Sequence, residues 1–213
     1  MLNQDLHRDA GSGKHQGPRK TTPDDPRWRS PLPPAPGELR IVQAFLNTAP
    51  GWKTSEELTD PDALAGWLEL WELIPQDTEI GKGELRRVLA VRQGLRAMVR
   101  ARDGKAAPRA AEALDREAGR SRVRPRFQAD GGVYYEVAAE GFEGALSRIF
   151  DAVRSAQLDG SWLLFKLCAD PHCGQAFYDF STNHGARWCR EICGNRRSAA
   201  SYRRRGRRLR FGL

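Results

Sequence analysis

Residues 168–193 read CADPHCGQAFYDFSTNHGARWCREIC, and this stretch holds all four cysteines of the 213-residue chain. Their spacing is C-x4-C-x15-C-x3-C, at Cys168, Cys173, Cys189 and Cys193. Four thiolates complete a tetrahedral shell around one Zn²⁺ ion, and a closed shell of this kind is structural. We therefore predict one structural zinc ion bound by these four residues.

The residues around the cysteines favour this interpretation. Between the first two cysteines, Asp170-Pro171 is a turn signal that lets their sulfur atoms converge. Gly174 follows the second cysteine, where its small size helps the chain fold past the ligand. The last two cysteines are four residues apart and share one face if a helix begins near Cys189. The thiolates would then lie at a helix N-terminus, whose dipole stabilises negative charge.

Three other interpretations of the cluster stay open. The same cysteines can form two disulfides, but the first 17 residues have no apolar segment after their charges, so we expect no secretory signal. His172 and His184 lie inside the cluster, and either can replace a cysteine as a ligand. A catalytic zinc normally has three protein ligands and an open position, whereas four cysteines are present here.

Positive charge is concentrated at the same end of the chain. The net charge is +8, and residues 161–213 carry 11 basic and 3 acidic groups, whereas the preceding residues are balanced. Such asymmetry favours a basic module that binds a polyanion. The alternative is a basic tail that only improves solvation. Anchoring of the arginines by the zinc ligands favours binding.

We predict that a basic helix follows the last cysteine and ends near Gly206. Contacts with phosphates would give it salt-sensitive affinity for nucleic acid. In a major groove, Asn195 can read adenine, and Arg196 or Arg197 can read guanine. The expected contact residues are Arg187, Arg190, Asn195, Arg196, Arg197, Arg203, Arg204 and Arg205.

The rest of the chain predicts a mainly α-helical body with one small β-hairpin. Apolar residues recur at helical spacing in five ranges: 38–48, 59–75, 83–102, 108–119 and 141–157. Two short β-prone runs flank Asp130-Gly131-Gly132, which is a good hairpin turn signal. No apolar run approaches the ~20 residues of a membrane span, so we expect no membrane partner.

The composition divides the chain into three parts. Residues 1–36 are rich in Pro, Gly, Asp and Arg and are expected to form a disordered arm, within which Trp28 can dock locally. Residues 37–160 form a helical domain. Residues 161–213, the zinc module, are expected to be treble-clef-like, a zinc knuckle ending in a basic helix. Because this module has little core, we expect chelation to unfold residues 168–205 and leave the body folded.

Residues 165–205 resemble the CGNR zinc finger, which is named for the tetrapeptide found here at residues 193–196. The similarity extends to Asp170, Pro171, Cys173, Phe177, Asp179, Arg187, Trp188, Cys189 and Tyr202. Residues 38–160 resemble the ABATE domain usually found upstream of it, through FLNT at 45–48, DPDALAGWL at 60–68 and a later LR-containing helix. The resemblance implies a bacterial transcription regulator whose four cysteines bind zinc and whose finger binds DNA.

We therefore expect a cytoplasmic, nucleoid-associated protein that binds double-stranded DNA. The upstream domain is expected to sense a ligand or to form a homodimer. Asn47 and Thr48 are candidate ligand-pocket residues, although an Asn at this position more often caps or ends its helix. The alternative function is a zinc module that binds RNA or an acidic protein. An enzyme is not expected, because the sequence has no P-loop, no G-x-S-x-G motif and no His-rich metal triad.

Overall fold

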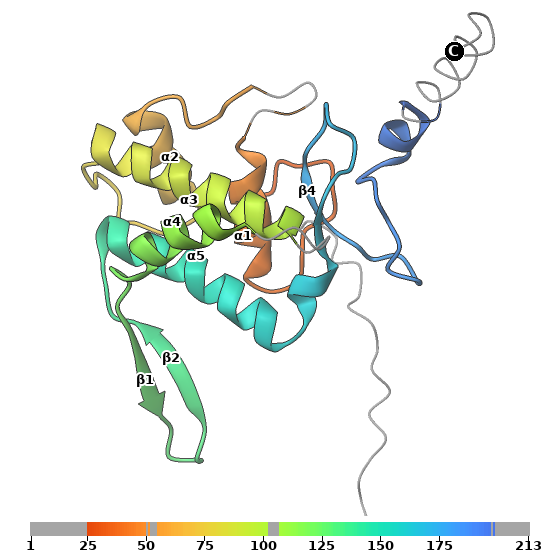
Figure 1. Cartoon of the computed structure of the whole chain (residues 1–213). Helices are drawn as coiled ribbons and strands as arrows, with labels where there is room; N and C mark the ends of the chain where they lie inside the picture. The colour runs from red at the N-terminus through yellow and green to blue at the C-terminus, as the bar shows by residue number, and fades with distance from the viewer. Residues whose placement is uncertain (1–24, 50, 52–54, 102–106, 197, 199–213) are drawn as a thin grey trace, which may run out of the picture.

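The computed structural model describes residues 25–49, 51, 55–101, 107–196 and 198. Five helices form the body: α1 (Leu39–Asn47), α2 (Pro61–Leu70), α3 (Lys82–Ala101), α4 (Pro108–Ala118) and α5 (Gly141–Leu158) (Figure 1). The antiparallel pairs are β1 (Val123–Phe127) with β2 (Val133–Val137), and β3 (Phe165–Leu167) with β4 (Ala176–Tyr178). A short 3-10 helix, η1 (Ser161–Leu164), precedes β3. The predicted fold class is confirmed, and the β3–β4 pair is an addition to it.

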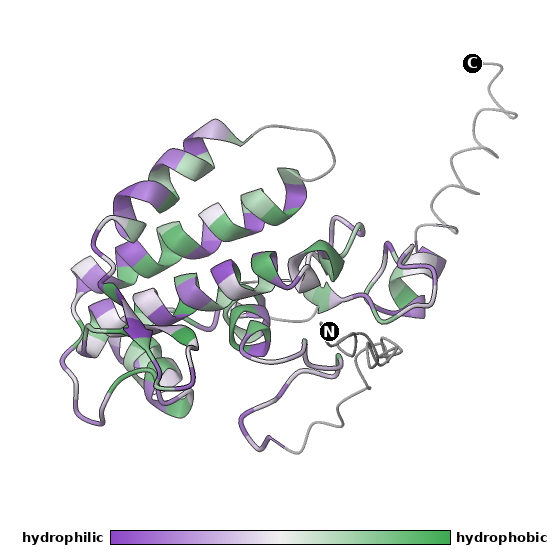
Figure 2. Ribbon diagram, turned by 90° about the horizontal axis from the view of Figure 1, so that it is seen from below, coloured by the Kyte–Doolittle hydropathy of each residue, from purple (hydrophilic) through white to green (hydrophobic). Residues whose placement is uncertain are grey.

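Helix α2 begins where its side chains predict. Asp60 is the N-cap, and its carboxylate accepts a hydrogen bond of 2.8 Å from the backbone N–H of Ala63. Pro61 occupies the first turn, where an N–H has no helical partner. The apolar residues at helical spacing in this range are buried: Leu64, Trp67, Leu68 and Trp71. Figure 2 shows the same segregation along the helices, which carry apolar residues on one side and polar residues on the other.

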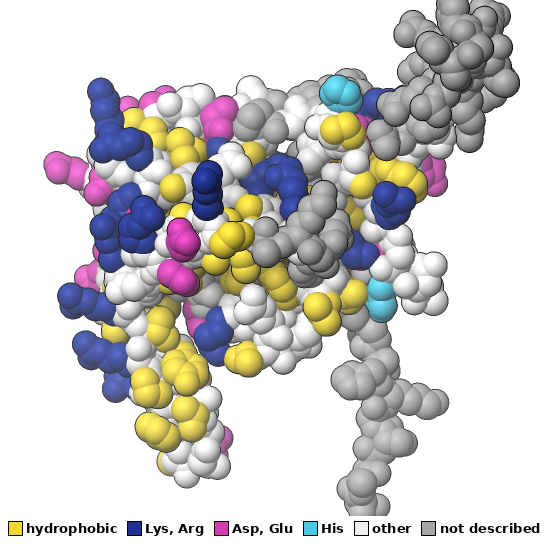
Figure 3. Space-filling model, in the orientation of Figure 1, with side chains coloured by type: hydrophobic (Ala, Val, Ile, Leu, Met, Phe, Trp, Pro, Cys, Tyr) yellow, Lys and Arg dark blue, Asp and Glu magenta, His cyan; other side chains and the backbone are white. Residues whose placement is uncertain are grey.

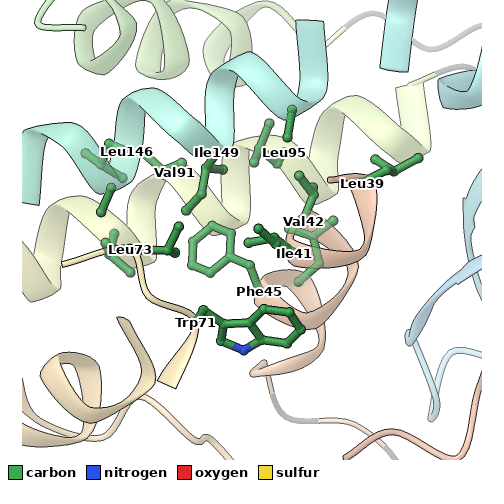
Figure 4. Close-up of a cluster of buried hydrophobic side chains, with 14 of the residues drawn as sticks. Leu39, Ile41, Val42, Phe45, Trp71, Leu73, Val91, Leu95, Leu146 and Ile149 are labelled. Atoms are coloured by element: carbon green, nitrogen blue, oxygen red, sulfur yellow. The ribbon is translucent and has the colours of Figure 1, made fainter. Parts of the chain in front are cut away.

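The main hydrophobic core lies between α1, α2, α3 and α5 (Figure 4). Phe45 of α1 is fully buried there and packs against Trp67, with ring centroids 5.6 Å apart. Helices α3 and α5 contribute Val91, Leu95, Leu146 and Ile149. Each of these side chains is removed from water, so the cluster supplies the main driving force for folding of the body.

The zinc module shares this core. Its buried residues Trp162, Phe165, Ala176 and Tyr178 belong to the same apolar cluster as the helices. Trp162 and Phe165 pack together with ring centroids 5.4 Å apart. Strands β3 and β4 are therefore not a separate folding unit held by metal alone. This packing revises the expectation that chelation leaves the body unaffected.

Part of the expected disordered arm is packed on the helices. Residues 25–36 are described, and within them the indole N–H of Trp28 donates a hydrogen bond of 2.8 Å to the carbonyl of Leu32. The Trp28 ring meets the Trp71 ring edge-on, with centroids 6.5 Å apart. Burial of one large aromatic side chain outweighs the polar, Pro-rich composition of this segment. Residues 1–24 lie outside the described part of the chain.

The hairpin β1–β2 extends from the body at the end opposite to residues 179–196 (Figure 1). Its register places one set of apolar residues on a single face: Val123, Pro125, Phe127, Val133, Tyr135 and Val137. Much of this face is exposed, and Phe127 is 79% accessible (Figure 3). The guanidinium of Arg154 on α5 lies 4.7 Å from the centroid of the Tyr135 ring and connects the hairpin to the body. None of the described helices is long and apolar enough to cross a bilayer.

The side chain of Asn47 joins α1 to β4. Its Nδ2 donates to the carbonyl of Ala176 at 3.0 Å, and its Oδ1 accepts from the N–H of Ala176 at 2.7 Å. Gln43, one turn earlier, donates to the same carbonyl at 3.4 Å. These amides occupy the backbone groups that a neighbouring strand would otherwise pair. Asn47 thus holds the zinc module against the helical body.

Thr48 belongs to a buried polar network at the end of α1. Its hydroxyl donates to the carbonyl of Phe45 at 2.7 Å and accepts from Nη1 of Arg92 at 2.8 Å. Arg92 is 2% exposed and pairs with Glu56 at 2.6 Å. The Asn47 amide and the Thr48 hydroxyl are therefore both used within the protein. Their predicted role in a ligand pocket stays a prediction.

We predict that Asn47→Ala lowers the free energy of unfolding by about 2 kcal/mol or more. The substitution leaves the buried N–H and C=O of Ala176 without their main partner, and each such group costs about 1–3 kcal/mol. Urea unfolding of the zinc-loaded protein, followed by circular dichroism, measures the change. Gln93→Ala, at an exposed position of α3, is the control and should change stability by less than about 0.5 kcal/mol. An effect at Asn47 no larger than the control's would contradict the assigned role.

Candidate metal centre

The four cysteine sulfur atoms converge on one point. All lie within 4.8 Å of one another, with 3.5 Å between Cys173 and Cys189 and 3.8 Å between Cys189 and Cys193. A tetrahedral shell with Zn–S distances of ~2.3 Å has S···S edges of about 3.8 Å, so the sulfur positions fit one zinc ion. Within the described part of the chain, His172 and His184 are not members of this ligand group.

The first pair of cysteines is held by a tight turn between β3 and β4. The N–H of Cys173 donates to the carbonyl of Asp170 at 2.9 Å. The N–H of His172 donates to the Asp170 carboxylate at 3.1 Å, which closes the turn from its other side. The two ends of the turn are joined by a hydrogen bond of 2.8 Å from the N–H of Cys168 to the carbonyl of Gln175. The predicted Asp-Pro turn is confirmed.

Gly174 is required by both its backbone conformation and its neighbours. Its φ of +59° lies in the left-handed region, and a Cβ there would be 3.0 Å from Nη2 of Arg96. Arg96 of α3 is buried and donates 2.8 Å hydrogen bonds to the carbonyls of Leu46 and Gly174. Burial, and then repulsion from Arg100, lower the pKa of Arg96 to about 10, so it remains charged at neutral pH. The Arg96 guanidinium therefore attaches the turn to α3, which carries it, and to the end of α1.

The second pair of cysteines lies at the start of a helix. Residues 191–196, which we call the finger helix, are helical, Cys189 lies in the bend before them, and Cys193 is in the first turn. The N–H of Cys193 donates to the carbonyl of Arg190 at 3.1 Å. The predicted start near Cys189 is therefore correct to within two residues. A hydrogen bond of 2.9 Å from the N–H of Ala169 to the carbonyl of Arg187 connects this segment to the first pair.

Crowding of the thiols opposes the formation of four thiolates in the absence of a cation. Contact with Cys173 lowers the pKa of Cys168 to about 2. Contact with Cys168 raises the pKa of Cys173 to about 11 and also raises the pKa of Cys189. One thiolate thus forms readily and is solvated by the other S–H groups, while further ionisation is opposed by like charge. A divalent cation removes this opposition because it attracts every thiolate.

Asp179 organises the connection between the two pairs. Its buried carboxylate accepts from the N–H of Ala186 at 2.9 Å and from the backbone and hydroxyl of Ser181 at 3.0 and 2.6 Å. Lys166 of β3 donates to it at 2.6 Å. Burial acts to raise the pKa of Asp179, but these donors, Lys166 first, outweigh it and hold the pKa below its usual value. Through Asp179 and Lys166, the segment that joins the two pairs of cysteines is therefore held against β3 just before the second pair.

Arg196, the arginine of the Cys-Gly-Asn-Arg tetrapeptide, faces the first pair of cysteines. Its Nη1 lies 3.1 Å from Oδ2 of Asp170, whose side chain is 1% exposed. A buried carboxylate is strongly destabilising unless it is paired, and Arg196 supplies that charge. Arg196 or Arg197 is expected to read guanine, and that role stays a prediction; in the structure, the guanidinium of Arg196 lies against the Asp-Pro turn. The ion pair fixes the finger helix relative to the turn.

The remaining predicted nucleic-acid contacts divide into two groups. Arg187 and Arg190 are exposed in the segment before the finger helix, and Asn195 is exposed on the helix itself. The guanidinium of Arg187 lies 5.6 Å from the centroid of the Trp188 ring. The others, Arg197, Arg203, Arg204 and Arg205, lie outside the described residues, as does most of the predicted basic helix.

Two family models match the chain. The model of the ABATE domain, described as "Putative stress-induced transcription regulator", matches residues 39–156, which is more than half of the chain. The model of the CGNR zinc finger matches residues 165–206 and so covers all four cysteines. Both matches agree with the sequence resemblances and are of the regulatory zinc-finger type. No curated protein matches the chain.

We predict that the purified protein contains one zinc ion per chain and that each Cys→Ser variant loses it. Removing a ligand should weaken binding by more than the ~10–100-fold that follows from changing a ligand's hydrogen-bonded neighbour. Atomic emission after dialysis against a weak chelator measures the zinc content. His172→Ala and His184→Ala are the controls and should retain the metal. Loss of zinc from either histidine variant, with retention by any cysteine variant, would contradict the four-cysteine site.

Proposed function

We propose that this chain, which belongs to the ABATE family and carries a CGNR zinc finger, is a transcription regulator that binds double-stranded DNA. One observation carries the proposal: the residues that converge on the metal position also fix the start of the finger helix. The exposed residue Arg190 lies just before that start, the exposed residue Asn195 lies on the helix, and the sequence continues into an arginine-rich segment. Zinc thus determines where these side chains lie.

Binding begins with the charge of the module. Residues 161–213 carry 11 basic and 3 acidic groups, so duplex DNA is attracted before any specific contact forms. Each arginine that neutralises a phosphate releases counterions, which makes the affinity depend on salt. This step needs charge but little geometry. It would therefore persist, in weakened form, in the absence of zinc.

Sequence preference requires fixed geometry. Asn195 is exposed on the finger helix, and its amide can pair with the N6 and N7 edge of adenine in a major groove. Arg196 positions the finger helix for base recognition, because its ion pair with Asp170 holds the helix at one angle to the Asp170-Pro171 turn. Removal of zinc would free the helix, so specific binding should fall more than non-specific binding.

The upstream domain is proposed to sense a small ligand. A cavity of about 400 Å³ is lined by Trp28, Trp67 and Trp71 and borders Asn47. A ligand bound there would contact the residue that holds β4 in place. The cavity is thus connected to the zinc module through the two Asn47–Ala176 hydrogen bonds.

We predict that zinc-loaded protein enriches a defined motif from a pool of random duplexes. Asn195→Ala should lose about 1–3 kcal/mol of discrimination at one base pair. Arg190→Ala should weaken binding to all duplexes uniformly and reduce the salt slope by about 0.9. The measurements are sequencing of bound fragments and fluorescence anisotropy over a range of salt concentrations.

Zinc-free protein is the control for geometry, and should bind random duplex while losing its preference for the motif. Single-stranded RNA and an acidic protein serve as competitors. Absence of duplex binding at low salt would contradict the proposal. Stronger binding of RNA or of the acidic protein than of every duplex would assign the module to that partner instead.

A further inference from the structure

A second group of basic side chains lies beside the zinc module, outside the finger helix. A cavity of about 440 Å³ lies between the end of α3, strand β3 and residues 185–187. Its lining includes Arg100, Lys166 and Arg187 and contains no acidic residue among the described side chains. We call this cavity the α3 cleft. Figure 1 shows the end of α3 beside the β3–β4 pair.

The charges around the α3 cleft are not balanced. Lys166 is paired with Asp179 at 2.6 Å. Arg100 and Arg187 are exposed and have no carboxylate within ion-pair distance among the residues that the structure describes. Arg96, behind them, donates its hydrogen bonds to backbone carbonyls, and Arg100 acts to lower its pKa. Arg96 and Arg100 on α3 thus repel each other, and Arg100 and Arg187 line the same cavity, where an anion would be attracted to both.

We propose that the α3 cleft binds a phosphate group of the duplex DNA that the finger helix enters. Guanidinium groups bind phosphate oxygens in a planar, bidentate arrangement, and two of them line this cavity. Arg187 lies two residues before Cys189, so one wall of the cleft belongs to the segment that leads into the finger helix. The proposal rests on the proposed function and extends it: a residue of the helical body, Arg100, takes part in DNA binding.

A competing role for these arginines is stabilisation of the metal centre. Four thiolates around Zn²⁺ carry a net charge of about −2, which nearby cations offset. Arg96 is the cation best placed for this, since it bonds to Gly174, the residue after Cys173. Arg100 and Arg187 face the cavity instead. The test must therefore measure zinc affinity as well as DNA affinity.

The decisive variant is Arg100→Ala/Arg187→Ala, compared with Arg122→Ala/Arg124→Ala. The second pair removes the same charge from exposed positions at the hairpin, at the other end of the body. Binding of the duplex selected by the unmodified protein is measured over a range of salt concentrations. We expect the cleft variant to reduce the magnitude of the salt slope by about 0.9, since the two arginines hold one phosphate and each lost phosphate contact accounts for ~0.9. The hairpin variant should leave the slope unchanged, and both variants should keep the same base preference.

Three outcomes would overturn the proposal. An unchanged salt slope in the cleft variant, with the unmodified protein binding duplex, rejects the cleft alone. A fall in zinc affinity that accompanies the loss of DNA binding, measured by competition with a chromophoric chelator, assigns the arginines to the metal centre. Absence of duplex binding by the unmodified protein rejects the proposed function together with the cleft. If the alanine variant unfolds, Arg100→Gln/Arg187→Gln must show the reduced slope, while Arg100→Lys/Arg187→Lys must retain most of it.

Discussion

The structure depends on how the backbone of Ala176 is bound by the side chain of Asn47. Two buried hydrogen bonds, of 3.0 and 2.7 Å, connect the last residue of α1 to strand β4, 129 positions later in the chain. Arg96 makes the same connection from α3, through the carbonyls of Leu46 and Gly174. The metal ligands, the β3–β4 pair and the helical core therefore form one packed unit rather than a body with an appended finger.

The regular parts of this fold could be predicted because their signals are local. The cap at Asp60, the proline after it and the apolar stripe that includes Trp67 determine α2 without reference to the rest of the chain. Cysteine spacing and the Asp170-Pro171 turn indicate the metal site in the same way. In each case, the physical cause lies within a few residues of its effect.

The connections between these parts could not be predicted, because their partners are distant in sequence. Asn47 and Arg96 are polar residues on amphipathic helices, and nothing in the local pattern separates them from solvent-exposed ones. The ion pair of Arg196 with Asp170 could not be predicted either, since nothing in the local sequence distinguishes Arg196 from the neighbouring arginines. Trp28 is expected to dock locally within a disordered arm, but composition does not show that its partner is the Trp71 ring.

The arginines of the chain thus have distinct roles that charge counting cannot separate. Arg92, Arg96 and Arg196 are engaged inside the protein and hold elements together. Arg100, Arg187 and Arg190 are exposed around the metal centre. Because the first group holds the elements around the metal centre together, the positions of the second group depend on the metal. Under the proposed function, this dependence would make specific binding require zinc, while the general attraction to nucleic acid would not.

The most direct test of this coupling is backbone amide hydrogen exchange in zinc-loaded and zinc-free protein. If the metal centre and the helical core are one unit, removal of zinc should increase exchange at Ala176 and in the last turn of α1, as well as in residues 189–196. The amides that pair β1 with β2 should be unaffected, since that hairpin lies at the other end of the body. Increased exchange confined to residues 189–196, with Ala176 and α1 unchanged, would contradict the account.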